Sequence, residues 1–307
     1  MRGASDQIGS AESQALSFIE PYQSCPLCGH TGLTRDSTIT LRDTPITWDR
    51  CSGCSLVFQN PRLSEASLRN LYAASNYFGM HKADPGSAYS AYPRDDPMRI
   101  EHARRRMARI TQLTGLQQGQ ALDVGSASGF FGVAAREAGF DVTCVEPDAE
   151  LAAYGRRQYG LRFIAAPLEA CTLDSERYDL ITLWGTDSHF LHPLHSFQRL
   201  IAALKPGGVM SMNYQDFDHW IRLVFPNLKI SWNAIYNLTD RSLDTLAAKI
   251  GLSLIARELE WQKVTIDHVA RVLRLPAPAV LRSRTIRLPT ISLRFVVFRK
   301  QVGQISN

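Results

Sequence analysis

A regular alternation of strand-like and helix-like segments between residues 120 and 213 most constrains the fold of this chain. Short apolar runs of strand length alternate with segments of helical periodicity, several of which end at glycine or before proline. Such alternation is typical of an α/β protein with a doubly wound, mostly parallel sheet. The expected strands are 121–125, 142–146, 162–165, 178–184 and 209–213, and the expected helices are 130–138, 148–159 and 194–204.

The loop after the first expected strand carries the sequence DVGSASG and opens a helix. Gly125 suits the sharp turn and Gly129 suits close packing of the helix, whereas Ala127 replaces the middle glycine of a dinucleotide fingerprint and argues against a pyrophosphate. Glu146 ends the next strand, where a carboxylate can accept both ribose hydroxyls of a nucleoside. The two features together predict a nucleoside cofactor. The alternative is that Glu146 only caps the helix that begins near Asp148.

Four cysteines near the N-terminus follow the pattern C-x2-C, 22 residues, C-x2-C. In a reducing compartment this spacing indicates a metal site, and an all-thiolate tetrahedral shell is the one that Zn²⁺ prefers. A closed shell leaves no open coordination position, so we assign the zinc to folding and not to catalysis. A redox pair and a site that holds no metal are the alternatives. The predicted ligands are Cys25, Cys28, Cys51 and Cys54.

Length and composition bound the remaining possibilities. At about 150 residues per domain, 307 residues suggest two domains or one domain with an extension. The chain is 45% hydrophobic and 21% charged, which is ordinary for a globular protein. No stretch reaches the ~18 consecutive apolar residues of a membrane span, and the N-terminus lacks the apolar region of a signal peptide. A cytoplasmic protein with no transmembrane segment is the expectation.

We expect four regions along the chain. Residues 1–20 form a disordered or loosely ordered N-terminus, and 21–60 form a zinc ribbon. Residues 61–115 form a helical linker and lid, with a loop that covers the site. Residues 116–307 form the catalytic core, with a basic insertion at about 262–290. Strands at either side of that insertion are expected to pair antiparallel and to complete the sheet.

Residues 119–213 resemble the class I S-adenosylmethionine-dependent methyltransferases. LDVGSASGFFG resembles their first motif, VTCVEPD their acidic ribose motif, YDLITLW their fourth motif, and LKPGGVMSMNY their fifth strand with its preceding turn. CPLCG and RCSGCSLVFQNPRLSEASLRNLY resemble the zinc ribbon and linker of a bacterial subgroup of small-molecule methyltransferases, which is associated with surface-polysaccharide, sugar or secondary-metabolite pathways. The resemblance implies a Rossmann-like seven-stranded sheet and two bound groups, S-adenosylmethionine and structural Zn²⁺.

The resemblance also implies roles at the ends of the first two expected strands. Gly125, Ala127 and Gly129 would line the methionine moiety and the sulfonium of the cofactor. Glu146 would hold the ribose hydroxyls, and Pro147 would contact the adenine edge.

Further cofactor roles fall on the first, third and fourth expected strands. Asp123 would lie beneath the loop and orient it. Leu168 and Glu169 would flank the adenine. Trp184 and Gly185 would form the floor near the transferred methyl group.

For catalysis, the acidic-histidine pair of the resembled family appears here as Ser188-His189, so the acid is missing. A hydroxyl or amine acceptor needs a base, and histidine titrates near neutral pH. His189 is the first candidate for this base, followed by Asp187 and Tyr214. His189 and Tyr214 also have structural interpretations, as a hydrogen-bonded structural histidine and as a pocket wall.

We therefore expect S-adenosylmethionine-dependent methyl transfer to a small-molecule acceptor, a sugar or a secondary metabolite, with O-methylation favoured. One alternative is an rRNA or tRNA base methyltransferase, and another is a catalytically silent nucleoside-binding scaffold. Residues 256–307 hold ten Lys and Arg against three Asp and Glu. This excess, like the arginine run at 104–106, indicates either a solvated surface or a patch for a phosphorylated, nucleotide-linked or nucleic-acid partner. The sequence does not define the oligomeric state.

Overall fold

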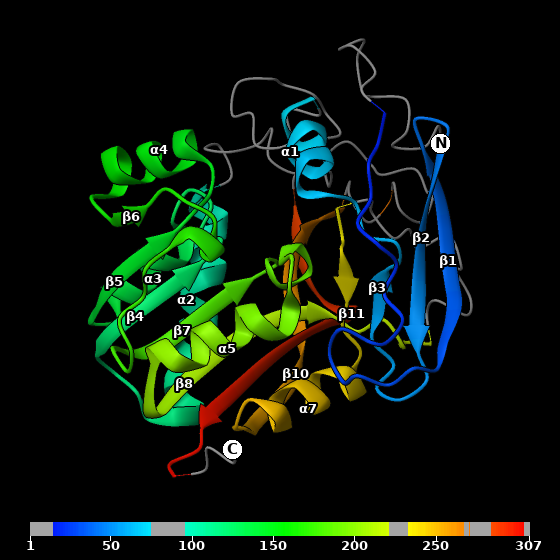
Figure 1. The fold of residues 1–307 in the computed structure, drawn as a ribbon. Helices are drawn as coiled ribbons and strands as arrows, with labels where there is room; N and C mark the ends of the chain where they lie inside the picture. Colours follow the sequence, from blue (N-terminus) through cyan, green and yellow to red (C-terminus); the bar gives the residue numbers. More distant parts are fainter. Residues whose placement is uncertain (1–14, 75–95, 221–232, 267–269, 271–283, 304–307) are drawn as a thin grey trace.

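The computed structural model describes residues 15–74, 96–220, 233–266, 270 and 284–303. Its main feature is a seven-stranded sheet of order β10-β11-β8-β7-β4-β5-β6, in which β11 alone runs against its neighbours (Figure 1). The predicted α/β fold with a mostly parallel sheet is thereby confirmed. The strands are β4 (Gly119–Val124), β5 (Phe140–Val145), β6 (Arg162–Ile164), β7 (Tyr178–Trp184), β8 (Leu204–Gln215), β10 (Leu252–Thr265) and β11 (Thr285–Lys300).

Helices cover both faces of this sheet because its strands are apolar on both sides. Adjacent residues of one strand enter different cores: Leu180 packs with α2 (Asp96–Thr114) and α3 (Phe130–Glu137), whereas Ile181 packs with α5 (Pro193–Ala203) and α7 (Asp240–Lys249). This period-two alternation is the geometric property of a strand, and burial on both faces requires two helical layers. α4 (Ala149–Tyr159) lies beside β6 at the far edge.

Local signals set the helix ends. The side chain of Asp148 accepts a hydrogen bond of 2.8 Å from the backbone N–H of Leu151 and so caps α4, which ends at Gly160 in the left-handed conformation. Thr239 and Ser242 form a reciprocal capping box at the start of α7. A cap of this kind contributes about 1 kcal/mol to stability.

A second sheet contains the cysteine-rich segment. Its order is β1-β2-β3-β9, and its strands are β1 (Leu33–Leu41), β2 (Thr44–Cys51), β3 (Val57–Gln59) and β9 (Tyr236–Asn237). Figure 1 shows β9, from the second half of the chain, beside β3 at the edge of the ribbon. Buried side chains of the ribbon also belong to the same hydrophobic cluster as α5 and α7. The ribbon is therefore built into the core of the protein.

The N-terminal segment differs in part from the expectation of loose order. Phe18 forms a β-bridge with Leu63, and the backbone N–H of Ile19 donates to the carbonyl of Arg62 at 2.9 Å. Residues 15–20 are thus hydrogen-bonded to the start of the linker, and residues 1–14 lie outside the described part.

The linker and the basic insertion are described only in part. The linker helix α1 spans Glu65–Ala74, and most of the expected covering loop lies outside the described residues. β10 and β11 continue to Thr265 and Thr285, so strands occupy both flanks of the expected insertion. The stretch 267–283 is outside the description, apart from residue 270. None of the described helices is long and apolar enough to cross a membrane.

Candidate active site and metal centre

A cavity of about 700 Å³ opens at the carboxyl ends of β4, β5 and β7. In an open α/β sheet this is where ligands bind, because the loops diverge there and leave a crevice. Eight of the residues predicted from the sequence line it: Gly125, Ala127, Glu146, Pro147, Glu169, Trp184, Gly185 and His189.

The loop between β4 and α3 forms one wall in the conformation that its glycines suggested. Gly125 has φ 70°, and a Cβ there would lie 2.1 Å from Oγ1 of Thr186. Gly129 has φ 91° and faces Leu161, which a Cβ would meet at 2.8 Å. Ala127, which replaces the usual glycine, also has a positive φ of 49°. It thus adopts a conformation that an L-residue reaches only at some cost in energy.

Glu146 is 4% exposed and lies in the cavity wall beside this loop. Its Oε2 accepts a hydrogen bond of 2.8 Å from the backbone N–H of Ala127, and its Oε1 accepts one of 2.9 Å from that of Asp148. Burial raises the pKa of Glu146 to about 7. Each carboxylate oxygen can accept a further hydrogen bond, so a ligand with two hydroxyls can still bind here. Asp148, and not Glu146, provides the side-chain cap of α4.

Asp123 lies next to the loop in sequence, is buried, and does not line the cavity. Its carboxylate accepts a hydrogen bond of 2.7 Å from Oγ1 of Thr182, and its backbone carbonyl accepts one of 2.6 Å from Oγ of Ser126. Burial raises the pKa of Asp123 to about 7. Gly129 and Leu168 also lie outside the lining, the latter as a buried residue directly before Glu169.

Of the three candidate bases, the structure brings His189 to the cavity. Its Nδ1 lies 3.1 Å from the backbone carbonyl oxygen of Asn233. A carbonyl can only accept, so Nδ1 carries the proton and Nε2 is the basic nitrogen of the neutral ring. Burial lowers the pKa of His189, which favours this neutral form near pH 7.

The structure places Asp187 and Tyr214 elsewhere, which corrects the sequence-based expectation. The carboxylate of Asp187 accepts hydrogen bonds from the backbone N–H groups of residues 187 and 188, and burial raises its pKa to about 7. The hydroxyl of Tyr214 donates to Oδ1 of Asp240 at 2.6 Å. Neither side chain lines the cavity: Asp187 is buried, and the hydroxyl of Tyr214 faces Asp240 at the start of α7.

Two walls of the cavity contain residues that the sequence analysis did not name as site residues, one of them in the expected linker and lid. Glu65, Leu68 and Arg69 of α1 line one side. Ile235 lines another side, and its backbone N–H donates to the carbonyl of Ser188 at 2.8 Å. The helical pattern of α1 was recognisable, but its partner surface depends on tertiary packing. The two residues before β9 carried no sequence signal of this role.

Asp96, at the start of α2, was also missed. Its two carboxylate oxygens accept hydrogen bonds from Ser128 at 2.9 Å and from Tyr159 at 2.6 Å. The side chain is buried and ties the cofactor loop to α2 and α4. A single acidic residue at the start of a helical pattern gives no sequence signal for such a contact.

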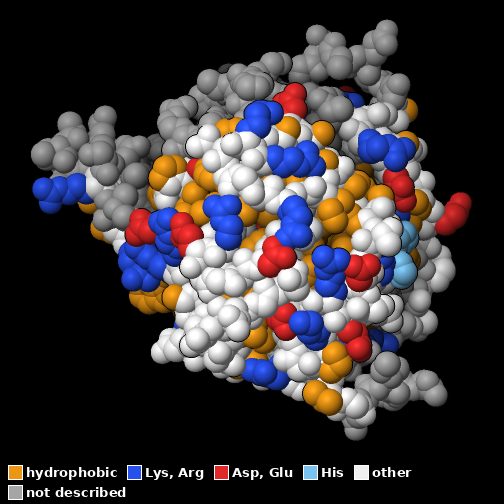
Figure 2. Space-filling view, turned by 90° about the vertical axis from the view of Figure 1, so that its left-hand side faces the viewer, with side chains coloured by type: hydrophobic (Ala, Val, Ile, Leu, Met, Phe, Trp, Pro, Cys, Tyr) orange, Lys and Arg blue, Asp and Glu red, His pale blue; other side chains and the backbone are white. Residues whose placement is uncertain are grey.

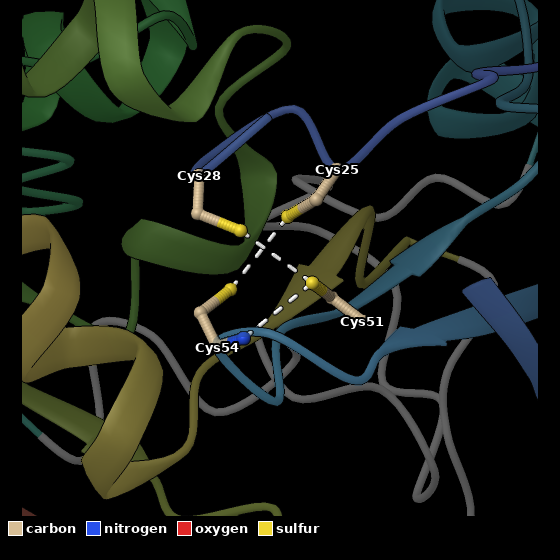
Figure 3. Close-up of side chains that lie close together, drawn as sticks. All are labelled: Cys25, Cys28, Cys51 and Cys54. Atoms are coloured by element: carbon tan, nitrogen blue, oxygen red, sulfur yellow. Dashed lines mark hydrogen bonds between the residues drawn. The ribbon is translucent and has the colours of Figure 1, made fainter. Parts of the chain in front are cut away.

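The four predicted metal ligands converge on one point (Figure 3). Their Sγ atoms all lie within 4.8 Å of one another, with Cys25 and Cys54 at 3.6 Å and Cys28 and Cys51 at 3.5 Å. Four sulfurs at ~2.3 Å from a tetrahedral zinc ion would be about 3.8 Å apart, so the donor set fits such an ion. The hydrogen bond from Cys54 lowers the pKa of Cys25 to about 5.

The basic run of α2 is neutralised locally. Arg104 pairs with Glu137, Arg105 with Glu101, Arg106 with Glu260 and Arg109 with Glu258. Figure 2 shows the face of the molecule on the side of α4 and β6, where Lys and Arg side chains are interspersed with Asp and Glu. The ion pairs favour the interpretation of α2 as a charged surface element over that of a nucleic-acid patch.

Comparison with known proteins agrees with this architecture. A family profile described as a methyltransferase domain matches residues 99–257. The fold resembles 1,6-didemethyltoxoflavin-N1-methyltransferase of Burkholderia thailandensis, with TM-score 0.51 and 14% identity over 87% of this chain and 100% of that one. It also resembles a protein of Bacillus halodurans C-125 classed as a methyltransferase, with TM-score 0.50 and 13% identity over 64% of this chain and 99% of that one. No curated protein matches in sequence.

The matched residues cover about half of the chain and include the loop after β4, Glu146, β7 and β8. The structural relatives show the same fold at low identity. The chain therefore belongs to the methyltransferase domain family.

Proposed function

We propose that this protein transfers the methyl group of S-adenosylmethionine to a small molecule, with a sugar or secondary-metabolite hydroxyl as the favoured acceptor. The observation that carries the proposal is the buried carboxylate of Glu146 in the cavity wall, facing the loop at Ala127. S-adenosylmethionine, when bound, supplies a methyl group already activated on a sulfonium. The protein therefore has to bind the cofactor and the acceptor, orient them toward each other, and exclude water from between them.

Different residues of the cavity contact different parts of the cofactor in this proposal. Glu146 holds the two ribose hydroxyls, and Pro147 and Glu169 flank the adenine. Gly125 and Ala127 line the methionine moiety, where the absence of large side chains leaves room for it. Asp123 keeps the loop in place from below, through the hydrogen bond of its backbone carbonyl with Ser126.

His189 and Trp184 lie on the acceptor side of the cavity in this proposal. The neutral His189 presents a basic Nε2 because its Nδ1–H is used by the carbonyl of Asn233. Nε2 can accept the proton that a hydroxyl loses as it is methylated, which is the reason that O-methylation is favoured. Trp184 provides a flat apolar floor. Transfer to nitrogen or carbon would use the same cavity without a need for His189.

Two observations support a small acceptor. The cavity has the dimensions of a small-molecule site, and α1 covers one side of it. The Burkholderia thailandensis relative was crystallised with bound 1,6-didemethyltoxoflavin and S-adenosylhomocysteine. The ion-paired arginines of α2 give no support to an RNA surface.

We further propose that the four cysteines hold a structural Zn²⁺. Four thiolates complete its tetrahedral shell, so the ion stabilises the ribbon and takes no part in methyl transfer. In a segment as small as this ribbon, such an ion supplies a large part of the folding free energy.

Calorimetric titration with S-adenosylhomocysteine tests the proposal, with one site per chain as the expected result. Incubation with methyl-labelled S-adenosylmethionine and either a small-molecule extract or total RNA then identifies the acceptor class. Label in the small-molecule fraction supports the proposal. Label in RNA supports the base methyltransferase, and binding with transfer to neither fraction supports the silent scaffold. Absence of S-adenosylhomocysteine binding would rule out the cofactor site itself.

A further inference from the structure

A second cavity, of about 420 Å³, lies between α2 and the β10–β11 hairpin. It is separate from the cofactor cavity, and the two share no lining residue. Its basic lining residues are Arg105, Arg106 and Arg109 of α2, Arg287 of β11, and His102. None of the roles derived above for cofactor or metal binding uses these side chains.

Arg106 is the most constrained of them, at 8% exposed. Its Nε donates to Oε1 of Glu260 at 3.0 Å, and its Cζ lies 4.2 Å from the centroid of the Trp184 ring. Glu260 is itself buried, and its Oε1 also lies 3.0 Å from Nε2 of His102. The guanidinium is thus fixed in orientation from two sides before any ligand arrives.

The terminal amino groups of Arg106 make no hydrogen bond to any residue in the described part of the chain, and neither is buried without a partner. A guanidinium held by Nε alone still presents its planar pair of N–H donors. That pair matches the two oxygens of a phosphate or carboxylate. Arg106 is therefore arranged as a bidentate anion receptor in the cavity wall.

The rest of the lining supports an organic anion over a bare ion. Arg105, Arg106 and Arg109 each pair with a glutamate, whereas Arg287 makes no ion pair with a described residue. The positive charge of Arg287 is therefore left uncompensated by the described residues. Trp261 and Leu259 line the same cavity and are 49% and 40% exposed. An exposed indole beside arginines is a surface on which a planar or apolar group can pack.

We propose that this second cavity binds an organic oxyanion, with its phosphate or carboxylate group held by Arg106 and Arg287 and its planar part against Trp261. Trp184 connects this site to the methyltransferase reaction. The guanidinium of Arg106 lies over the ring of Trp184. Phe295, which lines the second cavity, stacks with the same ring at a centroid distance of 6.1 Å. The indole of Trp184 also forms part of the wall of the cofactor cavity. The oxyanion belongs either to the acceptor or to a separate effector.

Calorimetry of the full chain with inorganic pyrophosphate and with uridine diphosphate tests the proposal. Both probes should bind saturably, and uridine diphosphate should bind more tightly because its base packs on Trp261. Arg287→Gln should weaken binding about fivefold, and Arg106→Lys, which keeps the charge beside Glu260 but loses the fork, about tenfold. Arg104→Gln is the matched control, because Arg104 lies on α2 outside the cavity and pairs with Glu137.

Absence of saturable binding of both probes would overturn the proposal. So would equal weakening by Arg104→Gln, which would indicate non-specific attraction to the helix. Circular dichroism of each variant confirms that it is folded, and Arg287→Gln changes an exposed residue. Trp261→Ala should weaken the binding of uridine diphosphate and leave the affinity for pyrophosphate within about twofold of the wild type, since a bare anion does not pack on the indole.

A further titration distinguishes the two sources of the oxyanion. If S-adenosylhomocysteine binds equally well with and without saturating uridine diphosphate, the second cavity holds part of the acceptor. If its affinity changes, the cavity holds an effector that acts through Trp184. The pyrophosphate titration needs no cofactor, so its result stands even if S-adenosylhomocysteine fails to bind and the proposed function is wrong.

Discussion

The indole nitrogen of Trp48, in the cysteine-rich ribbon, donates a hydrogen bond of 2.8 Å to the backbone carbonyl of Ala234. The next residue, Ile235, lines the cofactor cavity, and its carbonyl accepts a hydrogen bond of 2.7 Å from the backbone N–H of Gln59. Trp48 lies in β2, three residues before the ligand Cys51. The cysteine cluster, the ribbon sheet and the cavity wall therefore form one continuous set of contacts.

Replacement of Trp48 by Phe should weaken this wall. The change removes the hydrogen bond and leaves a partly buried carbonyl without its donor, at a cost of about 1–2 kcal/mol in the free energy of unfolding. Urea denaturation measures this loss, and hydrogen exchange should show faster exchange at residues 235–237. Trp220→Phe is the control, because Trp220 is 57% exposed. Equal exchange in the two variants would show that the ribbon does not support the wall.

Loss of the proposed zinc ion should also weaken the cavity wall at Ile235, because that wall is hydrogen-bonded to the ribbon. Cys51→Ser should reduce bound zinc from one ion per chain and raise hydrogen exchange at both β3 and β9, because β9 pairs only with the ribbon among the described strands. β4 and β5 should keep their protection, since both strands pair with neighbours of the seven-stranded sheet and neither pairs with the ribbon. Cys144→Ala is the control, as Cys144 is buried in β5 away from the cluster. Unchanged exchange at β9 after loss of zinc would contradict the connection.

Glu146→Ala should weaken S-adenosylhomocysteine binding about tenfold or more, because it removes a pair of charge-assisted hydrogen bonds. The affinity of the wild type should also fall as pH falls from 8 to 6. The pKa of Glu146 is about 7, and protonation removes the acceptor that the ribose hydroxyls need. Calorimetry at several pH values measures both effects. Glu150→Ala, at an exposed position in the first turn of α4, should bind like the wild type. A flat pH profile would remove the ribose assignment.

Buried carboxyl groups should make the protein less stable as pH rises from about 5 to 7. Burial raises the pKa values of Asp123, Glu146 and Asp187 to about 7, so the native state binds more protons than the unfolded state in this range. The lowered pKa values of His189 and Cys25 oppose this trend, because the unfolded state binds more protons at these two groups, but three groups act in the stated direction. Asp123→Asn, which keeps an acceptor for Thr182, should flatten the dependence of Tm on pH. Asp174→Asn, at an exposed site, should not.

Ala127 offers a test of backbone strain in the cofactor loop. A non-glycine residue in the left-handed region costs about 1 kcal/mol, so Ala127→Gly should leave stability unchanged or raise it slightly. Ala127→Val should lower the free energy of unfolding by about 1–3 kcal/mol, because a β-branched side chain tolerates positive φ poorly and the site is buried. Chemical denaturation of the two variants compares them directly. A less stable glycine variant would show that the loop is not strained at this position.

Short-range patterns determined the core of this protein. The period-two alternation within each strand sets which side chains face each helical layer, so the doubly wound sheet was predictable from local sequence. The spacing of the cysteines, the glycines of the first loop and the position of Glu146 at a strand end are likewise local features. Each defines a geometry within a few residues.

Tertiary structure decided which distant segments meet. The pairing of β3 with β9, the cover of the cavity by α1 and the stacking of Arg106 on Trp184 join residues that are far apart in sequence. No local spacing encodes such contacts, because they follow from how whole layers pack. For the same reason Asp187 and Tyr214 seemed suitable by residue type, yet their side chains satisfy nearby backbone and α7 instead of the cavity.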